Sequence, residues 1–270
     1  MTRALSAVQV IMKPRVGRAR RTRPARILIV GASGTIGSTL LRLLAAEGAT
    51  IGAHYYQHKA VLEQTARACR LASSRVKLFG ADVRGQRQCH ALVDAFVEWA
   101  GGIDSLVQLS GDVRNPCAWE VLSESDWLAD LNVNLSGPFF LVQRAMRHMR
   151  EHGGRILLTS TASAKHGGGR TSMAYGVAKA GIECLTKACA RDGAAHGILV
   201  NAIAPGFIES RFHAQRMRRT PEELARRATL VPLKRAGKPE DVARLIRYLL
   251  SPEAAYITGE CIAVSGGDWL

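Results

Sequence analysis

The chain has 270 residues, of which 47% are hydrophobic and 22% charged. This length and composition exclude a disordered or collagen-like chain and allow one substantial buried core. The net charge of +15 is typical of nucleic-acid-binding proteins, but the first 26 residues alone hold eight Lys and Arg and no acid. Since about half of the excess lies in this terminal segment, we expect no nucleic-acid partner.

Residues 1–25 are predicted to form a basic, disordered tail, and residues 26–270 a single folded domain. The longest apolar stretch, residues 197–208, is interrupted by Asn201 and Pro205 and is too short to span a membrane. The six cysteines form no C-x-x-C pair, which favours reduced thiols and neither disulfides nor a metal site. A soluble, cytoplasmic protein with no membrane partner is therefore expected.

Short aliphatic runs alternate with longer segments of helical period from Arg26 onward. The predicted strands span residues 26–30, 50–54, 76–80, 105–109, 155–159, 199–203 and 261–264. The predicted helices span residues 36–47, 60–71, 86–99, 126–151, 173–196 and 239–250. This alternation predicts an α/β fold, a single doubly wound domain of Rossmann type with a seven-stranded parallel sheet. Residues 209–228 are predicted to form a mobile helical flap beyond the strand ends, where ligands of such sheets bind.

A glycine-rich turn, Gly-Ala-Ser-Gly-Thr-Ile-Gly at residues 31–37, follows the first predicted strand and leads into a helix. Glycine permits a tight turn, and the start of a helix offers unpaired N–H groups to a pyrophosphate. The alternative is a glycine-rich turn that binds no nucleotide. We assign cofactor contacts to Gly31, Ser33, Gly34, Thr35, Ile36 and Gly37.

The end of the second predicted strand, residues 53–59, contains no acid. An NAD site places a carboxylate there for the ribose 2′-hydroxyl, whereas a 2′-phosphate needs cationic or hydroxyl groups. Tyr55, His58 and Lys59 offer such groups, so NADP(H) is preferred over NAD(H). Asp82, after the third strand, would accept from the adenine amino group; the alternative is a solvated acid at a strand end.

Tyr175 and Lys179 stand four residues apart in a predicted helix, so the phenol and the ammonium share one helix face. A cation about 4 Å away supplies the roughly 4 kcal/mol that would bring a tyrosine pKa from about 10 to about 7. The pair suits proton transfer to or from a carbonyl or alcohol oxygen. By itself this spacing is common on helices and carries no function.

The order of these motifs resembles the short-chain dehydrogenase/reductase family over residues 26–270. The shared motifs are the glycine turn, the hydroxyl pair Ser160 and Thr161, Tyr175 with Lys179, Asn134 within Val-Asn-Leu-Ser-Gly, and Asn-Ala-Ile-Ala-Pro-Gly at residues 201–206. Pro-Leu-Lys-Arg-Ala-Gly-Lys-Pro-Glu-Asp-Val-Ala at 232–243, Ile-Thr-Gly-Glu at 257–260 and Val-Ser-Gly-Gly at 264–267 are most similar to the 3-oxoacyl-acyl-carrier-protein reductase branch.

The resemblance implies a role for each matching residue. Tyr175 would be the proton donor, Lys179 would also hold the nicotinamide ribose, and Asn134 would hold a water that links Lys179 to solvent. A hydroxyl after the fifth strand would orient the carbonyl. Tyr175 and Lys179 would also contact the cofactor, together with Val83, Gly111, Pro205, Gly206, Ile208 and Ser210.

This chain departs from the family pattern at three places. The middle glycine of the phosphate turn is shifted by one residue, and the family's Asn-Asn-Ala-Gly after the fourth strand is Gln-Leu-Ser-Gly at residues 108–111. The family's catalytic serine stands thirteen residues before the tyrosine, where this chain has Ala162. Either Ser160 or Thr161 takes its place, depending on the length of an insertion before Tyr175, and residue type favours Ser160.

The resemblance implies an NADP(H)-dependent oxidoreductase that reduces a ketone, including a 3-oxoacyl thioester, to a secondary alcohol. One alternative is oxidation of a secondary alcohol, and another is a non-catalytic protein that senses its cofactor. The expected partners are a small-molecule or carrier-tethered carbonyl substrate and further copies of this chain, as a homotetramer or dimer. Arg144 and Arg191 lie on predicted helices where an acidic carrier would be steered by charge.

Overall fold

The computed structural model describes residues 24–68 and 75–268. All seven strands lie in one sheet of order β3-β2-β1-β4-β5-β6-β7, and every neighbouring pair is parallel. The strands are β1 (Arg26–Val30), β2 (Thr50–Tyr55), β3 (Val76–Gly80), β4 (Ser105–Gln108), β5 (Gly154–Thr159), β6 (Ile198–Pro205) and β7 (Cys261–Val264). The predicted fold class is confirmed. The predicted disorder of the N-terminal tail falls almost wholly outside the described residues.

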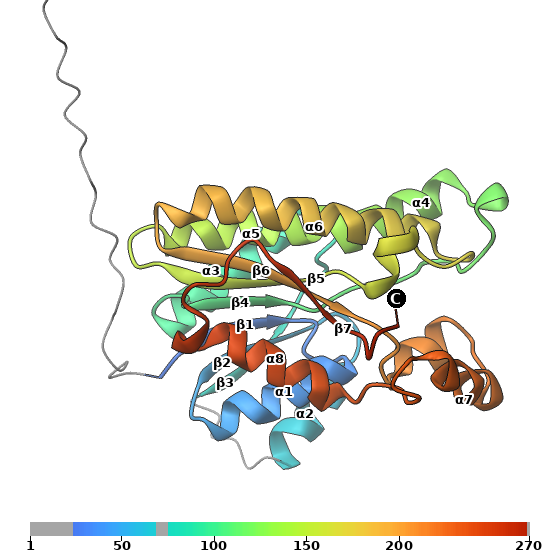
Figure 1. Cartoon of the computed structure of the whole chain (residues 1–270). Coiled ribbons are helices and arrows are strands. Elements are labelled where there is room, and N and C mark those ends of the chain that lie inside the picture. The colour runs from blue at the N-terminus through green and yellow to red at the C-terminus, as the bar shows by residue number, and fades with distance from the viewer. Residues whose placement is uncertain (1–23, 69–74, 269–270) are drawn as a thin grey trace, which may run out of the picture.

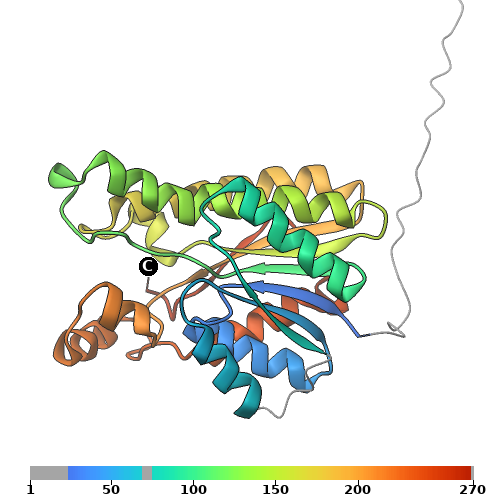
Figure 2. The same ribbon diagram turned by 180° about the vertical axis from the view of Figure 1, so that it is seen from behind.

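Helices cover both faces of the sheet (Figures 1 and 2). They are α1 (Thr35–Ala46), α2 (Lys59–Ala68), α3 (Gln86–Ala100), α4 (Glu124–Leu131), α5 (Gly137–Met149), α6 (Met173–Ala194), α7 (Pro221–Leu230) and α8 (Pro239–Leu250). One layer contains α3, α5 and α6, and the other contains α1, α2 and α8. The end of the helix predicted at residues 60–71 lies outside the described residues.

The core lies on both sides of the central strands. In β1, Leu28 and Val30 pack with the α3, α5 and α6 layer, whereas Ile27 and Ile29 pack with the α1 and α8 layer. Side chains alternate between the two faces of a strand, so a strand covered on both faces consists of consecutive apolar residues. This packing explains why the strands are readable in the sequence as aliphatic runs.

The prediction of a single helix over residues 126–151 is wrong. The structure has α4, a π-helical turn η2 (Asn132–Ser136) and then α5. Pro138, in the first turn of α5, has no N–H group to donate to the carbonyl four residues earlier, and a wider turn at this place avoids the need for that bond. Gly137 also packs tightly, since a Cβ atom there would lie 2.0 Å from the carbonyl oxygen of Val83. The break determines where Asn134 lies.

The flap predicted at residues 209–228 contains a π-helical turn, η4 (Phe212–Arg216), and α7. Both project beyond the carboxyl ends of the strands (Figures 1 and 2). Thr220 and Glu223 form a capping box at the start of α7, which satisfies amide groups that would otherwise have no partner. The helical content of the flap is confirmed, and its mobility stays a prediction.

Across residues 24–68 and 75–268, none of the helices combines the length and the apolar composition needed to cross a membrane. Within the same residues, no group of three or more His, Cys, Asp or Glu is arranged to hold a metal ion. The described cysteines, which exclude Cys69, have free thiols.

Candidate active site

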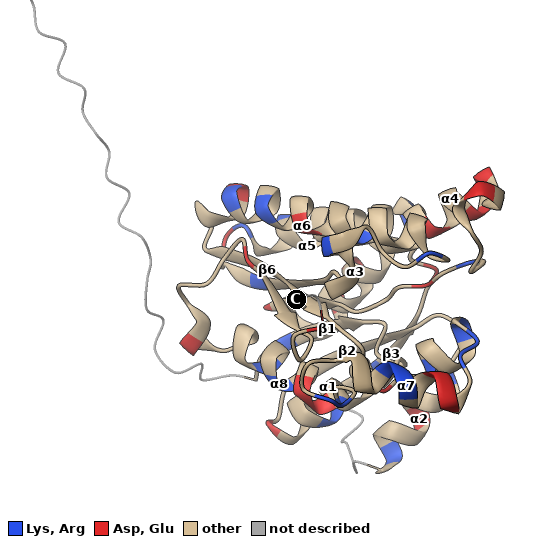
Figure 3. Ribbon diagram, turned by 45° about the vertical axis from the view of Figure 1, so that its right-hand side comes forward, with Lys and Arg blue, Asp and Glu red and all other residues tan. Residues whose placement is uncertain are grey.

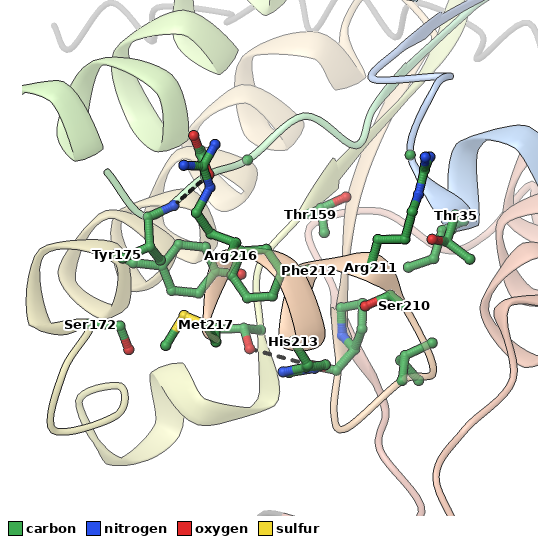
Figure 4. Close-up of a pocket in the computed structure, with 18 of the residues that line it drawn as sticks. Thr35, Thr159, Ser172, Tyr175, Ser210, Arg211, Phe212, His213, Arg216 and Met217 are labelled. Carbon is green, nitrogen blue, oxygen red and sulfur yellow. Dashed lines mark hydrogen bonds and ion pairs between the residues drawn. The ribbon is translucent and has the colours of Figure 1, made fainter. Parts of the chain in front are cut away.

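A cavity of about 1290 Å³ lies between the turns that follow the strands and the flap (Figure 4). It brings together most residues assigned from the sequence: Gly31, Ser33, Gly34, Thr35, Ile36, Gly37, Asp82, Val83, Gly111, Ser160, Thr161, Tyr175, Lys179, Pro205, Gly206, Ile208 and Ser210. Two assigned residues, Tyr55 and Asn134, are not part of its lining. The site therefore combines a glycine turn with hydroxyl and amine groups in one space.

The glycine turn after β1 requires glycine for steric reasons. Gly31 has a φ of +83°, and a Cβ atom there would lie 2.6 Å from the backbone nitrogen of Ser110. A Cβ atom on Gly37 would lie 2.4 Å from the carbonyl oxygen of Gly31. Because α1 begins at Thr35, the amide groups of its first turn are available to an anion at the cavity wall. This arrangement fits the pyrophosphate of a dinucleotide.

His54, at the end of β2, holds the glycine turn in place. The backbone N–H of Gly31 donates to His54 Nδ1 at 3.1 Å, and His54 Nε2 lies 3.0 Å from the carbonyl oxygen of Ala81. These partners assign the proton of the neutral ring to Nε2. Burial lowers the pKa of His54, which keeps this tautomer neutral at pH 7. Sequence reasoning missed this residue; its signal is a histidine inside a strand that is otherwise apolar.

The tyrosine that lines the cavity after β2 is Tyr56, one residue later than the predicted Tyr55. Tyr55 continues the strand and packs against the α1 and α8 layer, whereas Tyr56, Gln57 and His58 line the cavity. A shift of one position along a strand moves a side chain to the opposite face, which explains the wrong assignment of Tyr55. Lys59 forms an ion pair with Glu63 at 3.2 Å.

Arg84, which the sequence analysis did not identify, lies beside these residues and lines the cavity. Its Nε donates to both carboxylate oxygens of Asp82, at 2.9 and 3.0 Å, and its Nη2 donates to the Tyr56 hydroxyl at 3.1 Å. The hydrogen bonds from Arg84 lower the pKa of Asp82. Asp82 is therefore an ionised, paired acid rather than a solvated one. The sequence signal for Arg84 is an arginine two positions after the acid that follows β3.

Tyr175 and Lys179 lie on α6, as the spacing predicts. The Lys179 Nζ lies 5.5 Å from the centre of the Tyr175 ring and donates to the carbonyl oxygen of Thr159 at 2.8 Å. Lys179 is only 1% exposed, and Tyr175 is half-buried at the cavity wall. The phenol ring packs against Phe212 of the flap with 5.9 Å between ring centres (Figure 4).

Burial dominates the proton affinities of this pair. It raises the pKa of Tyr175 to about 12, partly offset by a hydrogen bond to Thr161, and it lowers the pKa of Lys179 to about 7. The expectation that Lys179 brings the tyrosine pKa near 7 is therefore wrong for the free protein, because both groups lose hydration and their neutral forms are favoured. The phenol keeps its proton at neutral pH.

The geometry favours Thr161 over Ser160 as the hydroxyl beside the tyrosine. Thr161 lines the cavity with Tyr175, its hydroxyl acts to lower the pKa of the phenol, and it lies 3.1 Å from the Ser163 hydroxyl. Ser160 is buried and its hydroxyl is 3.0 Å from both the Lys179 carbonyl oxygen and a Glu183 carboxylate oxygen. The preference for Ser160 is thus not supported. Successive residues after β5 face opposite directions, and the sequence alone left the loop length open.

Asn134 lies behind the cavity wall rather than in it. Its Nδ2 donates to the carbonyl oxygens of Asp112 and Asp130, at 2.6 and 2.9 Å, and its Oδ1 accepts from the Asp112 backbone. A Cβ atom on Gly111 would lie 2.9 Å from Asn134 Oδ1 and 3.4 Å from Lys179 Nζ. Asn134 is therefore next to the lysine, and only a glycine fits between them and the cavity.

At residues 108–111 the chain has Gln-Leu-Ser-Gly where the family pattern has Asn-Asn-Ala-Gly. Here Gln108 forms the hydrogen bonds that hold the end of β4. Its side-chain Nε2 donates to the Ser110 carbonyl oxygen at 2.8 Å, and its own carbonyl oxygen accepts from the Thr159 hydroxyl at 2.7 Å. The second of these bonds joins β4 to β5 at the edge of the sheet that borders the cavity. The strand end is thus held by groups other than those of the family pattern.

The flap crosses the cavity through charged and aromatic contacts. Arg211 donates to the carbonyl oxygen of Ser33 in the glycine turn at 2.8 Å, and Arg216 donates to the Asp112 carboxylate at 2.5 Å. His213 packs beside Phe212, and burial, with a smaller contribution from nearby arginines, lowers its pKa to about 4. The flap therefore presents the Phe212 ring to Tyr175, with the neutral imidazole of His213 beside Phe212 (Figure 4).

Comparisons with known proteins agree on one family. Residues 31–268 match the family described as Enoyl-(Acyl carrier protein) reductase. The chain is 36% identical over 244 residues to a 3-oxoacyl-acyl-carrier-protein reductase of Thermotoga maritima, covering 89% of this chain and 96% of the relative. It is 33% identical over 248 residues to a probable 2,4-dienoyl-CoA reductase of Bacillus subtilis, covering 90% and 96%.

Solved structures give the same result. A short-chain dehydrogenase/reductase from Serratia marcescens superimposes with a TM-score of 0.83 at 29% identity, covering 92% of this chain and 99% of that one. An actinorhodin polyketide ketoreductase solved with NADPH gives a TM-score of 0.81 at 29% identity, covering 91% and 97%. The chain therefore belongs to the short-chain dehydrogenase/reductase family, within its 3-oxoacyl-acyl-carrier-protein-reductase-like branch, and is an NAD(P)-dependent oxidoreductase acting on CH–OH and C=O groups.

Proposed function

We propose that this protein reduces a ketone to a secondary alcohol with NADPH, using Tyr175 as the proton donor. The observation that carries the proposal is the Tyr175 phenol, which lies beside the buried Lys179 and lines the same cavity as the Thr161 hydroxyl and the glycine turn. The phenol holds its proton at neutral pH, as a proton donor must. A protein that only senses its cofactor would have no need of this acid.

The cavity residues fit a dinucleotide, which would supply the hydride. The first turn of α1 and the glycine turn would hold the pyrophosphate, while Pro205, Gly206, Ile208 and Ser210 would line the nicotinamide end. Lys179 would donate to the nicotinamide ribose. Thr161 would donate a hydrogen bond to the substrate oxygen and hold it against Tyr175, and the phenol would pass its proton to that oxygen as negative charge develops.

The experiment that tests the proposal is a substrate panel monitored through nicotinamide absorbance. The panel contains 3-oxoacyl thioesters of coenzyme A and of a carrier protein, free ketones, secondary alcohols and a 2,4-dienoyl thioester. We expect ketone reduction to have the highest kcat/KM. Reduction of the dienoyl thioester alone, or oxidation faster than reduction at neutral pH, would contradict the proposal.

The arginine-rich composition of the flap favours a substrate that carries negative charge. It holds six arginines, Arg211, Arg216, Arg218, Arg219, Arg226 and Arg227, and in Figure 3 basic and acidic positions lie together on the ribbon around α7. Three of these arginines pair with acids, Arg216 with Asp112, Arg219 with Glu223 and Arg227 with Asp268, and within the described residues the other three form no ion pair. Arg144 and Arg191 are both paired, with Asp94 and Asp192, so the predicted carrier surface on the long helices is partly neutralised. Phosphate groups of a coenzyme A or carrier-bound thioester would be attracted to the flap instead.

We expect Arg84→Ala to raise the KM for NADPH by about 10-fold and the KM for NADH by less than about threefold. Arg84, Tyr56 and His58 line the cavity next to the end of β2, and a charge-assisted hydrogen bond contributes roughly 1.5–3 kcal/mol. Steady-state kinetics with both cofactors measure the effect. Arg87→Ala is the matched control, since Arg87 is exposed on the next helix and outside the cavity. Equal losses with both cofactors would contradict the NADPH preference.

We also propose that the chain forms a homotetramer, or at least a dimer. Phe139 of α5 is 41% exposed, and Met173 and Val177 of α6 are 37% and 45% exposed. Large apolar side chains gathered on neighbouring helices are typical of subunit contacts. Light scattering at micromolar concentration is expected to give an oligomeric mass that Val177→Asp reduces. A monomeric mass for the unmodified protein would contradict this expectation.

We assign both the cofactor and the substrate site to residues 26–270 and propose that residues 1–25 form a separate tail. The sequence argument for this division is the acid-free composition of the tail and the start of the first strand at Arg26. We place the protein in the cytoplasm. Its proposed cofactor suits a reducing compartment, and so do the free thiols of the cysteines that the structure describes.

A further inference from the structure

Glu183 is an acid on the same face of α6 as Tyr175 and Lys179. The three residues are spaced by four along the helix, and residues at this spacing lie one above another. The Glu183 side chain is 20% exposed and is not part of the cavity lining. The proposed reaction does not use it, so its partial burial calls for another explanation.

The carboxylate of Glu183 is contacted by groups from different elements. The Ser160 hydroxyl lies 3.0 Å from Glu183 Oε1, and Lys165 Nζ lies 3.6 Å from Glu183 Oε2. Burial and the neighbouring Glu183 carboxylate raise the pKa of the Cys261 thiol of β7. A partly buried carboxylate with partners on both oxygens costs less to desolvate than an unpaired one. Glu183 thus joins α6 to the segment after β5.

Two of these partners flank Thr161. Ser160 is the residue before it, and Lys165 belongs to the short 3-10 helix η3 (Ala162–His166) that follows it. The hydroxyl of Thr161 lies 3.1 Å from the Ser163 hydroxyl, slightly longer than a typical hydrogen bond between hydroxyls, and 3.4 Å from the Pro205 carbonyl oxygen, which is near the limit. The position of Thr161 therefore depends on how the backbone on either side is anchored.

We propose that Glu183 is a positioning residue that anchors both ends of the turn after β5 and so holds the Thr161 hydroxyl against Tyr175. The inference rests on the proposed function, because only there does Thr161 orient a carbonyl. A displacement of about 1 Å at such a group lowers a rate by up to about 100-fold. Loss of the anchor therefore acts on turnover and leaves cofactor binding unchanged.

The test is a double-mutant cycle with saturating NADPH and the best ketone of the panel. Glu183→Ala is expected to lower kcat about 10-fold while the KM for NADPH stays within twofold. Glu183→Gln keeps an acceptor for Ser160 and is expected to retain at least about a third of kcat. In a Thr161→Val background, Glu183→Ala is expected to change kcat less than twofold, because the group that it positions is already gone.

A second measurement does not depend on turnover. In the free protein, hydrogen exchange of the peptide covering residues 159–166 is expected to be faster in Glu183→Ala than in wild type. Asp192→Ala is the matched control, since Asp192 is an exposed acid on α6 whose recorded ion pair is with Arg191. This control is expected to change neither kcat nor the exchange of that peptide. Where Glu183→Ala does not fold, Ser160→Ala replaces it, because it removes the same hydrogen bond from the other side.

An equal fold-loss of kcat in the wild-type and Thr161→Val backgrounds would overturn the proposal, since it would show a general structural effect. Unchanged exchange at residues 159–166 would also overturn it. A wild-type protein that reduces no member of the panel would instead refute the proposed function, and this result would be seen before any variant is compared.

Discussion

Tyr175→Phe is expected to lower kcat for ketone reduction by at least about 100-fold, since general acid catalysis contributes about 10²–10⁴-fold. The substitution removes only the hydroxyl and keeps the ring that packs against Phe212. The buried Lys179 and its bond to the Thr159 carbonyl oxygen also remain. Affinity for NADPH, measured by fluorescence titration, is therefore expected to stay within about threefold of wild type.

The matched control for this substitution is Tyr248→Phe. Tyr248 is 44% exposed on α8, away from the cavity lining, so its variant should turn over like wild type. If Tyr175→Phe keeps more than about a tenth of wild-type kcat, a loss below about 1.4 kcal/mol in activation free energy, another group donates the proton and the assignment fails.

Lys179→Met is expected to abolish most of the activity and yet to stabilise the fold at acidic pH. Burial lowers the pKa of Lys179 from 10.5 to about 7, which corresponds to roughly 5 kcal/mol of disfavoured charging. A methionine of similar length removes that cost but also loses the bond to Thr159. The net gain in unfolding free energy at pH 6 is expected to be about 2–3 kcal/mol.

The pH dependence of this gain follows from the direction of the shift. Between about pH 7 and 10.5, the unfolded chain binds a proton at Lys179 that the folded protein has released, so wild-type stability rises with pH in this window. Below about pH 7 both states are protonated, and the folded protein carries the full cost of the buried ammonium. The advantage of Lys179→Met is therefore largest at pH 6 and shrinks toward pH 10.

Urea unfolding of wild type and variant at pH 6, 8 and 9.5 measures this trend. Lys187→Met is the matched control, because Lys187 is an exposed lysine on the same helix and its variant should follow wild type at each pH. A Lys179→Met protein that is less stable than wild type at pH 6, or that shows the same pH dependence, would mean that the lysine is solvated or paired in the folded protein.

The sheet could be predicted closely from the sequence, because its strands are buried on both faces and contain consecutive aliphatic residues. The break within residues 126–151 was missed, since the apolar period continues through Gly137 and Pro138 and hides the change of turn. The spacing of apolar residues in the sequence indicates which face of a helix is buried. It does not indicate whether a backbone hydrogen bond is missing along that face.

The candidate site was predictable where each residue acts through its own chain neighbours. The glycine turn and the Tyr175–Lys179 spacing are of this kind. His54 and Glu183 were missed because the Gly31 amide and the Ser160 hydroxyl that they bind lie 23 residues away in other elements. Arg84 was missed because its bond to Tyr56 spans 28 residues, although its partner Asp82 is only two residues away. The choice between Ser160 and Thr161 depended on a side-chain direction that a one-residue change in loop length reverses.

The all-parallel order of the sheet affects how the protein reaches its native state. None of the described strands pairs through a tight hairpin, and the central pair β1 and β4 places Ile27 opposite Ser105, far along the chain. Closing such long loops costs conformational entropy before any strand contact compensates for it. Folding is therefore governed by long-range contacts and is slow for a chain of this size. Until β4 arrives, the apolar edge of β1 has no neighbour on that side, and at this stage the chain is most prone to aggregate.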